Sequence, residues 1–127
     1  MGTVLKQCEH ILYADHTVLY ASGKRSEEIE QKLNHDLVSI GNWFWENNLI
    51  INLKKTKTEC VLFGTHQRTS KAKPIEIKMH GVDVVESSTY EYLGVTMDKN
   101  LTLADHMNKV IRKTTSRTNL LGRIHNL

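Results

Sequence analysis

The stretch HILYADHTVLYAS, residues 10–22, contains two runs of β-branched, aromatic and leucine residues on either side of a short polar break. The runs, at 9–13 and 17–21, are typical of strands, and Ala14-Asp15-His16 is short enough for a tight turn, so the stretch predicts a β-hairpin. An aspartate at a hairpin tip can bind a hard cation such as Mg²⁺, or it can satisfy its own backbone in an Asx-turn. Taken alone, the hairpin favours the Asx-turn.

The segment after this hairpin predicts an amphipathic helix. Ser26 can cap it, with Glu27 and Glu28 near its positive end, and it ends at about Asn47-Asn48. Its apolar stripe consists of Ile29, Leu33, Leu37, Ile40 and Phe44. Val38 and Trp45 form a smaller apolar patch on the other side, which we expect to pack against a loop or another part of the protein.

Extended structure is predicted downstream. LIINL and TECVLFG are two short extended pieces, the polar segment 65–73 is a loop, and IEIKMHGVDVV is a hairpin turning at His80-Gly81. In that hairpin Ile77 pairs with Val84 and Met79 with Val82. TYEYLGVTM, judged by its residues, is one more strand.

From Thr102 the pattern is helical again. Apolar residues form one stripe of this last helix, and basic residues lie on its other side: Lys109, Arg112, Lys113 and Arg123. The sequence therefore predicts an α+β fold, a small antiparallel sheet with two main amphipathic helices on one face.

Composition permits many functions. The chain has 127 residues, suited to one domain, and its net charge of +3 permits a polyanionic partner without requiring one. Cys8 and Cys60 are far apart in the sequence and show no metal-site spacing. No segment is apolar and long enough to span a membrane, and no signal-peptide pattern is present, so we expect an intracellular protein with reduced cysteines, nuclear or cytoplasmic.

Three blocks, in order, resemble the reverse transcriptases of non-LTR (LINE-like) retrotransposons. YADHTVLYAS is similar to the family's Tyr-Ala-Asp-Asp box, GNWFWENNLIINLKKTKTECVLFG to the helix end and lysine-bearing segment that follow, and YEYLGVTMDKNLTLADHM to the primer-grip hairpin and the start of the thumb. The resemblance runs from about Cys8 to the C-terminus. It implies a C-terminal palm fragment at residues 1–99 and the start of a thumb helix at 100–127.

The resemblance also implies chemistry. The family extends a DNA primer on an RNA template by two-metal nucleotidyl transfer with Mg²⁺. Asp15 matches a metal ligand, Lys55 a lysine proposed to protonate pyrophosphate, and Tyr92, Leu93 and Gly94 the residues that place the primer end. The basic side of the last helix matches a surface that lies along the duplex.

The sequence departs from the family pattern at two points. His16 stands where the family has a second aspartate, and the 127 residues hold no counterpart of a third, upstream aspartate. Imidazole is a poor Mg²⁺ ligand, so we expect no polymerisation by this chain alone and no stably bound Mg²⁺. The other aspartates considered, Asp36, Asp83, Asp98 and Asp105, have local structural explanations.

Alternatives remain for the singled-out residues. His16 could join Asp15 and His10 in a zinc site, although the ligand count falls short of four. Lys54, Lys55 and Lys57 could be an ordinary solvated run, and Tyr92 to Val95 an ordinary buried strand. A second function class, a non-catalytic nucleic-acid-binding module, would use the basic last helix, which could equally be a solvated helix packed on the sheet.

Overall fold

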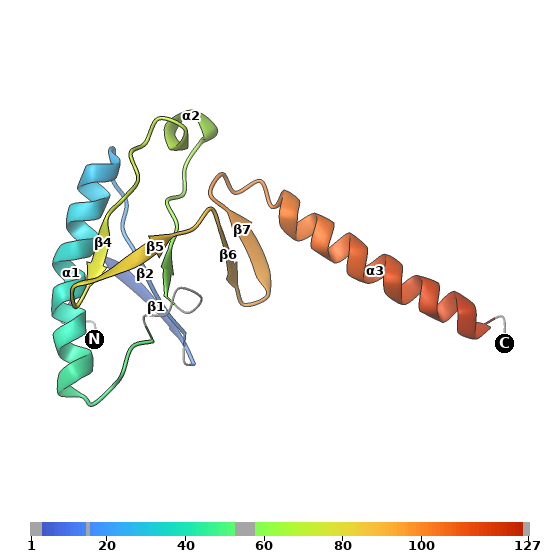
Figure 1. The fold of residues 1–127 in the computed structure, drawn as a ribbon, viewed down its shortest axis with the longest axis horizontal. Helices are drawn as coiled ribbons and strands as arrows, with labels where there is room; N and C mark the ends of the chain where they lie inside the picture. Colours follow the sequence, from blue (N-terminus) through green and yellow to red (C-terminus); the bar gives the residue numbers. More distant parts are fainter. Residues whose placement is uncertain (1–3, 15, 53–57, 126–127) are drawn as a thin grey trace.

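The computed structural model describes residues 4–14, 16–52 and 58–125. In chain order its elements are β1 (Glu9–Tyr13), β2 (His16–Tyr20), α1 (Ser26–Glu46), β3 (Glu59–Cys60), α2 (His66–Thr69), β4 (Ile77–Met79), β5 (Val82–Glu86), β6 (Thr89–Tyr92), β7 (Val95–Asp98) and α3 (Ala104–His125). The described strands form the sheets β1-β2, β3-β5-β4 and β6-β7 (Figure 1). The predicted α+β class is confirmed, with the sheet divided into small pieces.

The core lies between α1 and β4. Leu37 and Ile40 of the predicted helical stripe are 9% and 1% exposed, and they meet Ile75, Ile77 and Met79, which are all buried. The alternation along residues 75–79 directs the odd-numbered side chains toward α1, because successive strand residues face opposite sides. Helix and strand therefore bury each other's apolar surface.

Polar side chains of α1 cover the open edge of β4. The Asn34 amide donates to the Glu76 carbonyl at 2.8 Å and accepts from the Lys78 N–H at 2.9 Å. Glu30 accepts from the Glu76 N–H at 3.0 Å. These contacts occupy backbone groups that an edge strand would otherwise leave open to pairing with another chain.

The predicted helix start and end are close to those observed. The N-cap is Arg25 rather than Ser26, and no side chain caps the helix, so the predicted cap is wrong. The end at Asn47-Asn48 is confirmed. Asn48 has a left-handed backbone (φ 54°), and the Leu49 N–H donates to the Phe44 carbonyl at 2.8 Å, which together terminate the helix in a Schellman-type turn.

The second predicted hairpin is correct and the strand after it is not. Ile77 pairs with Val84 and Met79 with Val82, across a turn in which His80 and Gly81 have positive φ. TYEYLGVTM, in contrast, is a hairpin of β6 and β7 that turns at Leu93-Gly94, with φ of 49° and 85°. Leucine is rare in a left-handed turn, so the residue types of TYEYLGVTM do not indicate a turn at Leu93.

Smaller differences concern the middle of the chain. Residues 49–52 form no strand, TECVLFG contributes only the two-residue β3, and β3 pairs with β5 in parallel rather than antiparallel. The predicted loop at 65–73 contains the single turn α2.

The last helix leaves the rest of the molecule. Figure 1 shows α3 projecting beyond the β6-β7 hairpin, and Met107, Ile111 and Leu121 of this helix are more than half exposed. It is tied down at its beginning, where the Asp98 carboxylate accepts from the Thr102 hydroxyl and the Leu103 N–H at 3.0 and 2.8 Å. The prediction that both helices cover one sheet face is therefore wrong for α3.

Candidate functional site

The β-hairpin predicted from the strand-like runs at 9–13 and 17–21 is present. β1 and β2 are antiparallel over five pairs, from Glu9 opposite Tyr20 to Tyr13 opposite His16. The predicted turn is therefore one residue too long, because His16 is the first residue of β2 rather than part of the turn. Its side chain is exposed, and Ala14 has a left-handed backbone (φ 51°). Asp15, the predicted metal ligand, lies outside the described residues.

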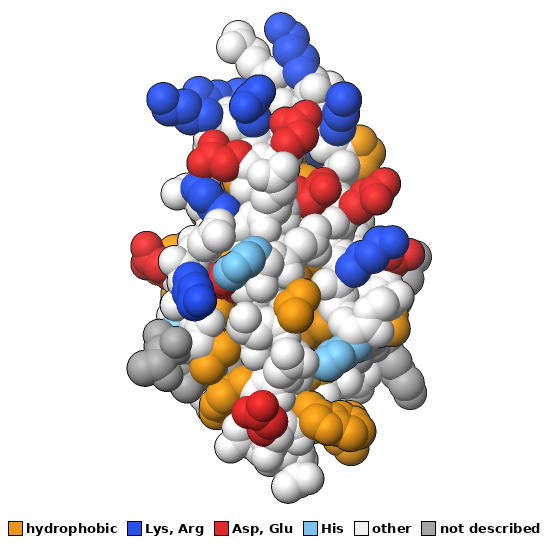
Figure 2. Space-filling model, turned by 90° about the vertical axis from the view of Figure 1, so that its left-hand side faces the viewer, with side chains coloured by type: hydrophobic (Ala, Val, Ile, Leu, Met, Phe, Trp, Pro, Cys, Tyr) orange, Lys and Arg blue, Asp and Glu red, His pale blue; other side chains and the backbone are white. Residues whose placement is uncertain are grey.

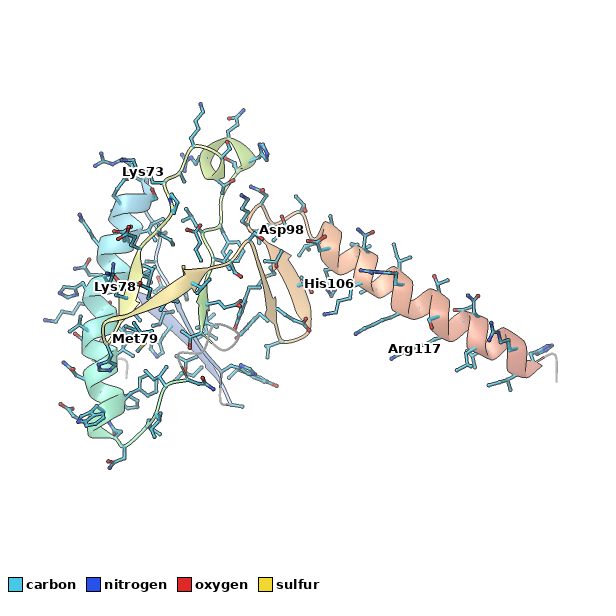
Figure 3. All side chains as sticks on the ribbon, in the orientation of Figure 1. Lys73, Lys78, Met79, Asp98, His106 and Arg117 are labelled. Carbon is cyan, nitrogen blue, oxygen red and sulfur yellow. The ribbon has the colours of Figure 1, made fainter. Side chains whose placement is uncertain are left out.

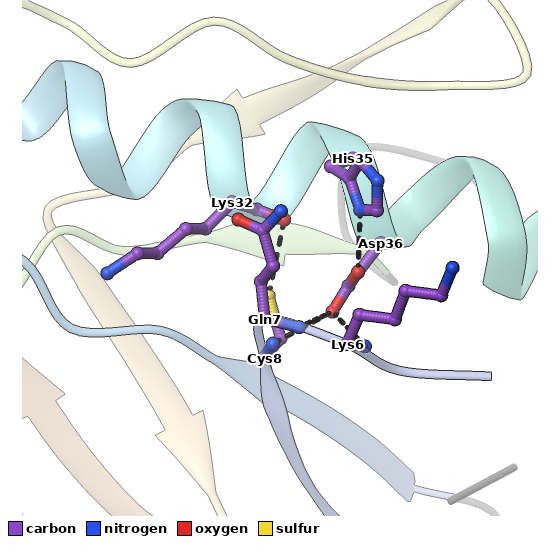
Figure 4. Close-up of polar contacts among 6 residues, drawn as sticks. All are labelled: Lys6, Gln7, Cys8, Lys32, His35 and Asp36. Carbon is purple, nitrogen blue, oxygen red and sulfur yellow. Dashed lines mark hydrogen bonds and ion pairs between the residues drawn. The ribbon is translucent and has the colours of Figure 1, made fainter. Parts of the chain in front are cut away.

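A buried carboxylate fixes the chain segment that leads into this hairpin. Asp36 is 1% exposed, and its Oδ2 accepts from the N–H groups of Lys6, Gln7 and Cys8 at 3.1, 2.8 and 2.8 Å (Figure 4). Its Oδ1 lies 2.9 Å from Nδ1 of His35. One side chain of α1 thus holds three consecutive backbone donors immediately before β1.

The Asp36 carboxyl is strongly stabilised in its ionised form. Burial by itself raises its pKa, but the hydrogen bonds from His35 and from the three N–H groups outweigh this effect and lower the pKa to about 2. A local structural explanation within the helix was predicted for Asp36, and its bonds to residues 6–8 were not. A signal was available: Asp36 is three residues after Leu33 and four before Ile40, so it lies on the apolar face of the helix.

The surroundings of both cysteines disfavour the thiolate. Both thiols are free. Burial raises the pKa of Cys8 to about 11, assisted by the nearby Asp36 charge, and burial beside Glu86 does the same for Cys60. Metal or nucleophilic chemistry requires the thiolate, which these pKa values disfavour.

Within 4–14, 16–52 and 58–125, no three His, Cys, Asp or Glu side chains come together in a way that could hold a metal ion. His10 and His16 are therefore not part of such a group there. A pair of Mg²⁺ ions needs several carboxylate oxygens, and the described residues do not provide that donor set.

The predicted primer-grip residues lie together at the end of the β6-β7 hairpin. Tyr92 is the last residue of β6, and Leu93 and Gly94 form the turn, where Leu93 is 53% exposed. The ring of Tyr92 stacks on that of Tyr90, with centroids 6.3 Å apart. The turn therefore offers an exposed apolar tip backed by two aromatic rings. Lys55 lies outside the described residues.

The basic side of α3 is accessible, with one cation partly engaged. Lys109 forms an ion pair with Glu91 of β6, at 2.5 Å. Arg112, Lys113 and Arg123 are exposed. At the start of the helix His106 accepts from the Thr96 N–H at 3.3 Å, and Figure 3 shows this side chain directed toward the hairpin, whereas Arg117 extends away from it. The basic side of α3 thus begins beside the β6-β7 hairpin and continues into solvent.

Residues 1–97 match the family described as reverse transcriptase (RNA-dependent DNA polymerase). The chain belongs to the reverse transcriptase family. This reverse transcriptase chain is also 31% identical, over 101 residues, to a Drosophila melanogaster protein described as "Probable RNA-directed DNA polymerase from transposon BS". The matched region is 80% of this chain and 11% of that protein, so the chain spans a small part of its relative.

No solved structure matches this reverse transcriptase chain. Among the described residues, no helix is both long and apolar enough to cross a membrane. The reverse transcriptase family in general uses divalent metal ions, an RNA template and a primer.

Proposed function

We propose that the chain is part of the polymerase of a non-LTR retrotransposon, with a C-terminal palm portion at residues 1–99 and the start of the thumb at 100–127. The observation that supports this best is the register of the β1-β2 hairpin, in which Tyr13 opposes His16. It puts Tyr13 and His16 of the YADH box at the end where the two strands join, which agrees with a box presented at a hairpin tip. The projection of α3 after the β6-β7 hairpin supports the boundary near residue 99.

The parent activity in this proposal is primer extension on an RNA template with Mg²⁺. Tyr92, Leu93 and Gly94 would contact the primer end, Asp15 would bind metal, and Lys55 would assist pyrophosphate departure. We assign no chemical step to the chain by itself, because His16 stands in place of an acid. An imidazole supplies neither the negative charge nor the two oxygen acceptors that Mg²⁺ coordination uses.

Primer extension tests the proposal at two levels. The 127-residue chain, incubated with primed RNA template, deoxynucleotides and Mg²⁺ or Mn²⁺, should give no product. The segment 8–98 should then replace the matching segment of a full-length active relative, with and without His16→Asp. We expect the substitution to increase extension on the order of a hundred-fold, the usual effect of one preorganised electrostatic group in a transition state.

His10→Asp in the same chimera is the matched control, because it makes the same chemical change in β1, away from the box. It should leave extension at the level of the unsubstituted chimera. Equal extension with and without His16→Asp would refute the assigned role of position 16, and product from the 127-residue chain alone would refute its inactivity.

A second candidate function, a nucleic-acid-binding module, is supported by the exposed cations of α3. Arg112, Lys113 and Arg123 follow one side of a helix whose other contacts are confined to its first turns. Binding of an RNA–DNA duplex through phosphates should weaken linearly on a log–log scale as salt rises. If no duplex binding is detected at about 20 mM salt, where ionic screening is weak, this candidate function is excluded.

A further inference from the structure

A cavity of about 700 Å³ lies at the opposite end of the molecule from the Tyr13–His16 end of the first hairpin. It is formed by the segment before α1, the first turn of that helix, and the stretch from Leu62 to Lys73 that includes α2. Figure 1 shows both parts at the end where α1 begins. This volume falls within the range of ligand-binding pockets in proteins.

The walls of this cavity carry an unusual concentration of positive charge. Five cationic residues line it, and all five are exposed: Lys24, Arg25, Arg68, Lys71 and Lys73. The acidic residue in the lining is Glu27. The whole chain, in contrast, has 17 basic and 14 acidic residues. Figure 2 shows Lys and Arg side chains gathered at this end of the α1 face.

The acidic groups beside the cavity balance only part of this charge. Among the described residues none of the five cations forms an ion pair; Glu27 lines the cavity, and the Glu28 charge acts on Arg25 while its carboxylate is paired with Lys32 at 2.7 Å. Five clustered cations with one acidic residue in the lining repel one another, so the site favours an anionic ligand.

The cavity also contains an exposed aromatic ring. Phe63 is 42% exposed and lines this cavity together with the five cations; it also borders a second, more apolar cavity next to Leu62. A basic surface with an aromatic platform is the combination that binds single-stranded nucleic acid, because phosphates meet the cations and a base stacks on the ring. A lipid headgroup or an acidic peptide would use the cations but not the planar face of the ring.

We propose that this cavity, the Phe63 cavity, binds single-stranded nucleic acid, with phosphates on Arg68, Lys71 and Lys73 and a base on Phe63. The Phe63 cavity is separate from the end of the β1-β2 hairpin and from α3. A strand bound there would be held at the side of the domain remote from the YADH box.

The test is fluorescence anisotropy of the full 127-residue chain with labelled 12-nucleotide oligo(U) RNA and oligo(dT) DNA, across salt concentrations. The triple substitution Arg68→Gln, Lys71→Gln, Lys73→Gln should reduce the salt slope by about 2, given about 0.7 per phosphate contact for single strands. Phe63→Leu should weaken binding about ten-fold, consistent with the loss of one stacked base. Comparison of the two oligonucleotides tells which sugar the site prefers.

Lys6→Gln, Lys78→Gln, Lys99→Gln is the matched control, since it removes the same charge from exposed positions outside the cavity. It should retain most of the affinity. The α3 cations stay unchanged in every variant of this series, so any contribution from the α3 surface is the same throughout. Circular dichroism spectra of all variants should match the wild type.

Equal losses in the cavity and control triples would overturn the proposal, because they would indicate attraction by net charge alone. Unchanged binding after Phe63→Leu would overturn the stacking contact. The choice of ligand would be overturned if the chain bound neither oligonucleotide but bound anionic vesicles or poly-Glu through the cavity cations. The vesicles contain about 30% phosphatidylserine, which gives them a negative surface potential like that of a cytoplasmic membrane leaflet.

Discussion

Replacing Asp36 by asparagine should weaken the attachment of residues 6–8, just before the first hairpin, to α1. The substitution keeps the shape of the side chain but removes the charge that three N–H groups and His35 stabilise. The pKa of the carboxyl falls from 3.8 to about 2 on folding. At 1.36 kcal/mol per pKa unit, ionised Asp36 contributes roughly 2.5 kcal/mol to stability at pH 7.

The sign of the pH dependence follows from the lowered pKa. The contribution is complete above the pKa of the unfolded chain, near 4, and is lost as pH falls through about 2. By linkage, the contribution of Asp36 to stability is roughly half of its pH 7 value at pH 3 and a few tenths of a kcal/mol at pH 2. The difference between wild type and Asp36→Asn should therefore shrink from about 2.5 to about 1.3 kcal/mol between pH 7 and pH 3.

Urea denaturation at pH 7 and pH 3 measures this difference, with Asp83→Asn as control. Asp83→Asn is the same chemical change at a side chain that is 80% exposed and whose Oδ1 lies 3.6 Å from Nζ of Lys78. We expect it to lower the free energy of unfolding by less than about 0.5 kcal/mol. Amide hydrogen exchange at Lys6, Gln7 and Cys8 should accelerate in Asp36→Asn. An Asp36→Asn destabilisation that is equal at both pH values would refute the electrostatic explanation.

Three further predictions concern packing, backbone and charge. Ile40→Ala should lower the free energy of unfolding by about 2–4 kcal/mol in urea titrations, because this side chain is 1% exposed in the core. Gly81→Ala should destabilise the chain by about 1 kcal/mol because its φ is 76°, whereas Gly122→Ala, equally free of clashes but inside α3, should raise helicity measured by circular dichroism. Glu91→Gln should release Lys109 and tighten duplex binding about two-fold at low salt, with little change in the melting temperature. An unchanged duplex affinity would contradict the α3 interface.

Periodicity predicted the parts of the fold in which each residue has a local reason for its position. The α1 stripe, the end of that helix at Asn48 and the His80-Gly81 turn all follow from side-chain spacing and from residues that accept a left-handed backbone. The Leu93-Gly94 turn did not follow from residue types, because leucine gives no local sign of a turn. It was implied by the family resemblance.

Long-range features escaped prediction for a different reason. The contact of Asp36 with residues 6–8 joins parts of the chain about 30 residues apart, and the pattern around Asp36 shows that it faces the core without showing what it binds. Amphipathicity of α3 likewise predicted a buried stripe, but burial depends on a partner surface, and the described sheets offer one only to its first turns.

Because the described contacts of α3 lie near its first turns, a small rotation there displaces the far end of the helix. Its 22 residues extend about 33 Å at 1.5 Å per residue, while its described anchors, Asp98 and His106, lie within the first turns or just before them. Rotation by roughly 10° about that anchor moves the far end by roughly 6 Å, about one helical pitch. Between β7 and α3, Leu101 and Leu103 have left-handed backbones, and both of their N–H groups donate to Asp98. The contacts of Asp98 and His106 and the Lys109–Glu91 ion pair together set the direction of α3 and so the position of its distal cations.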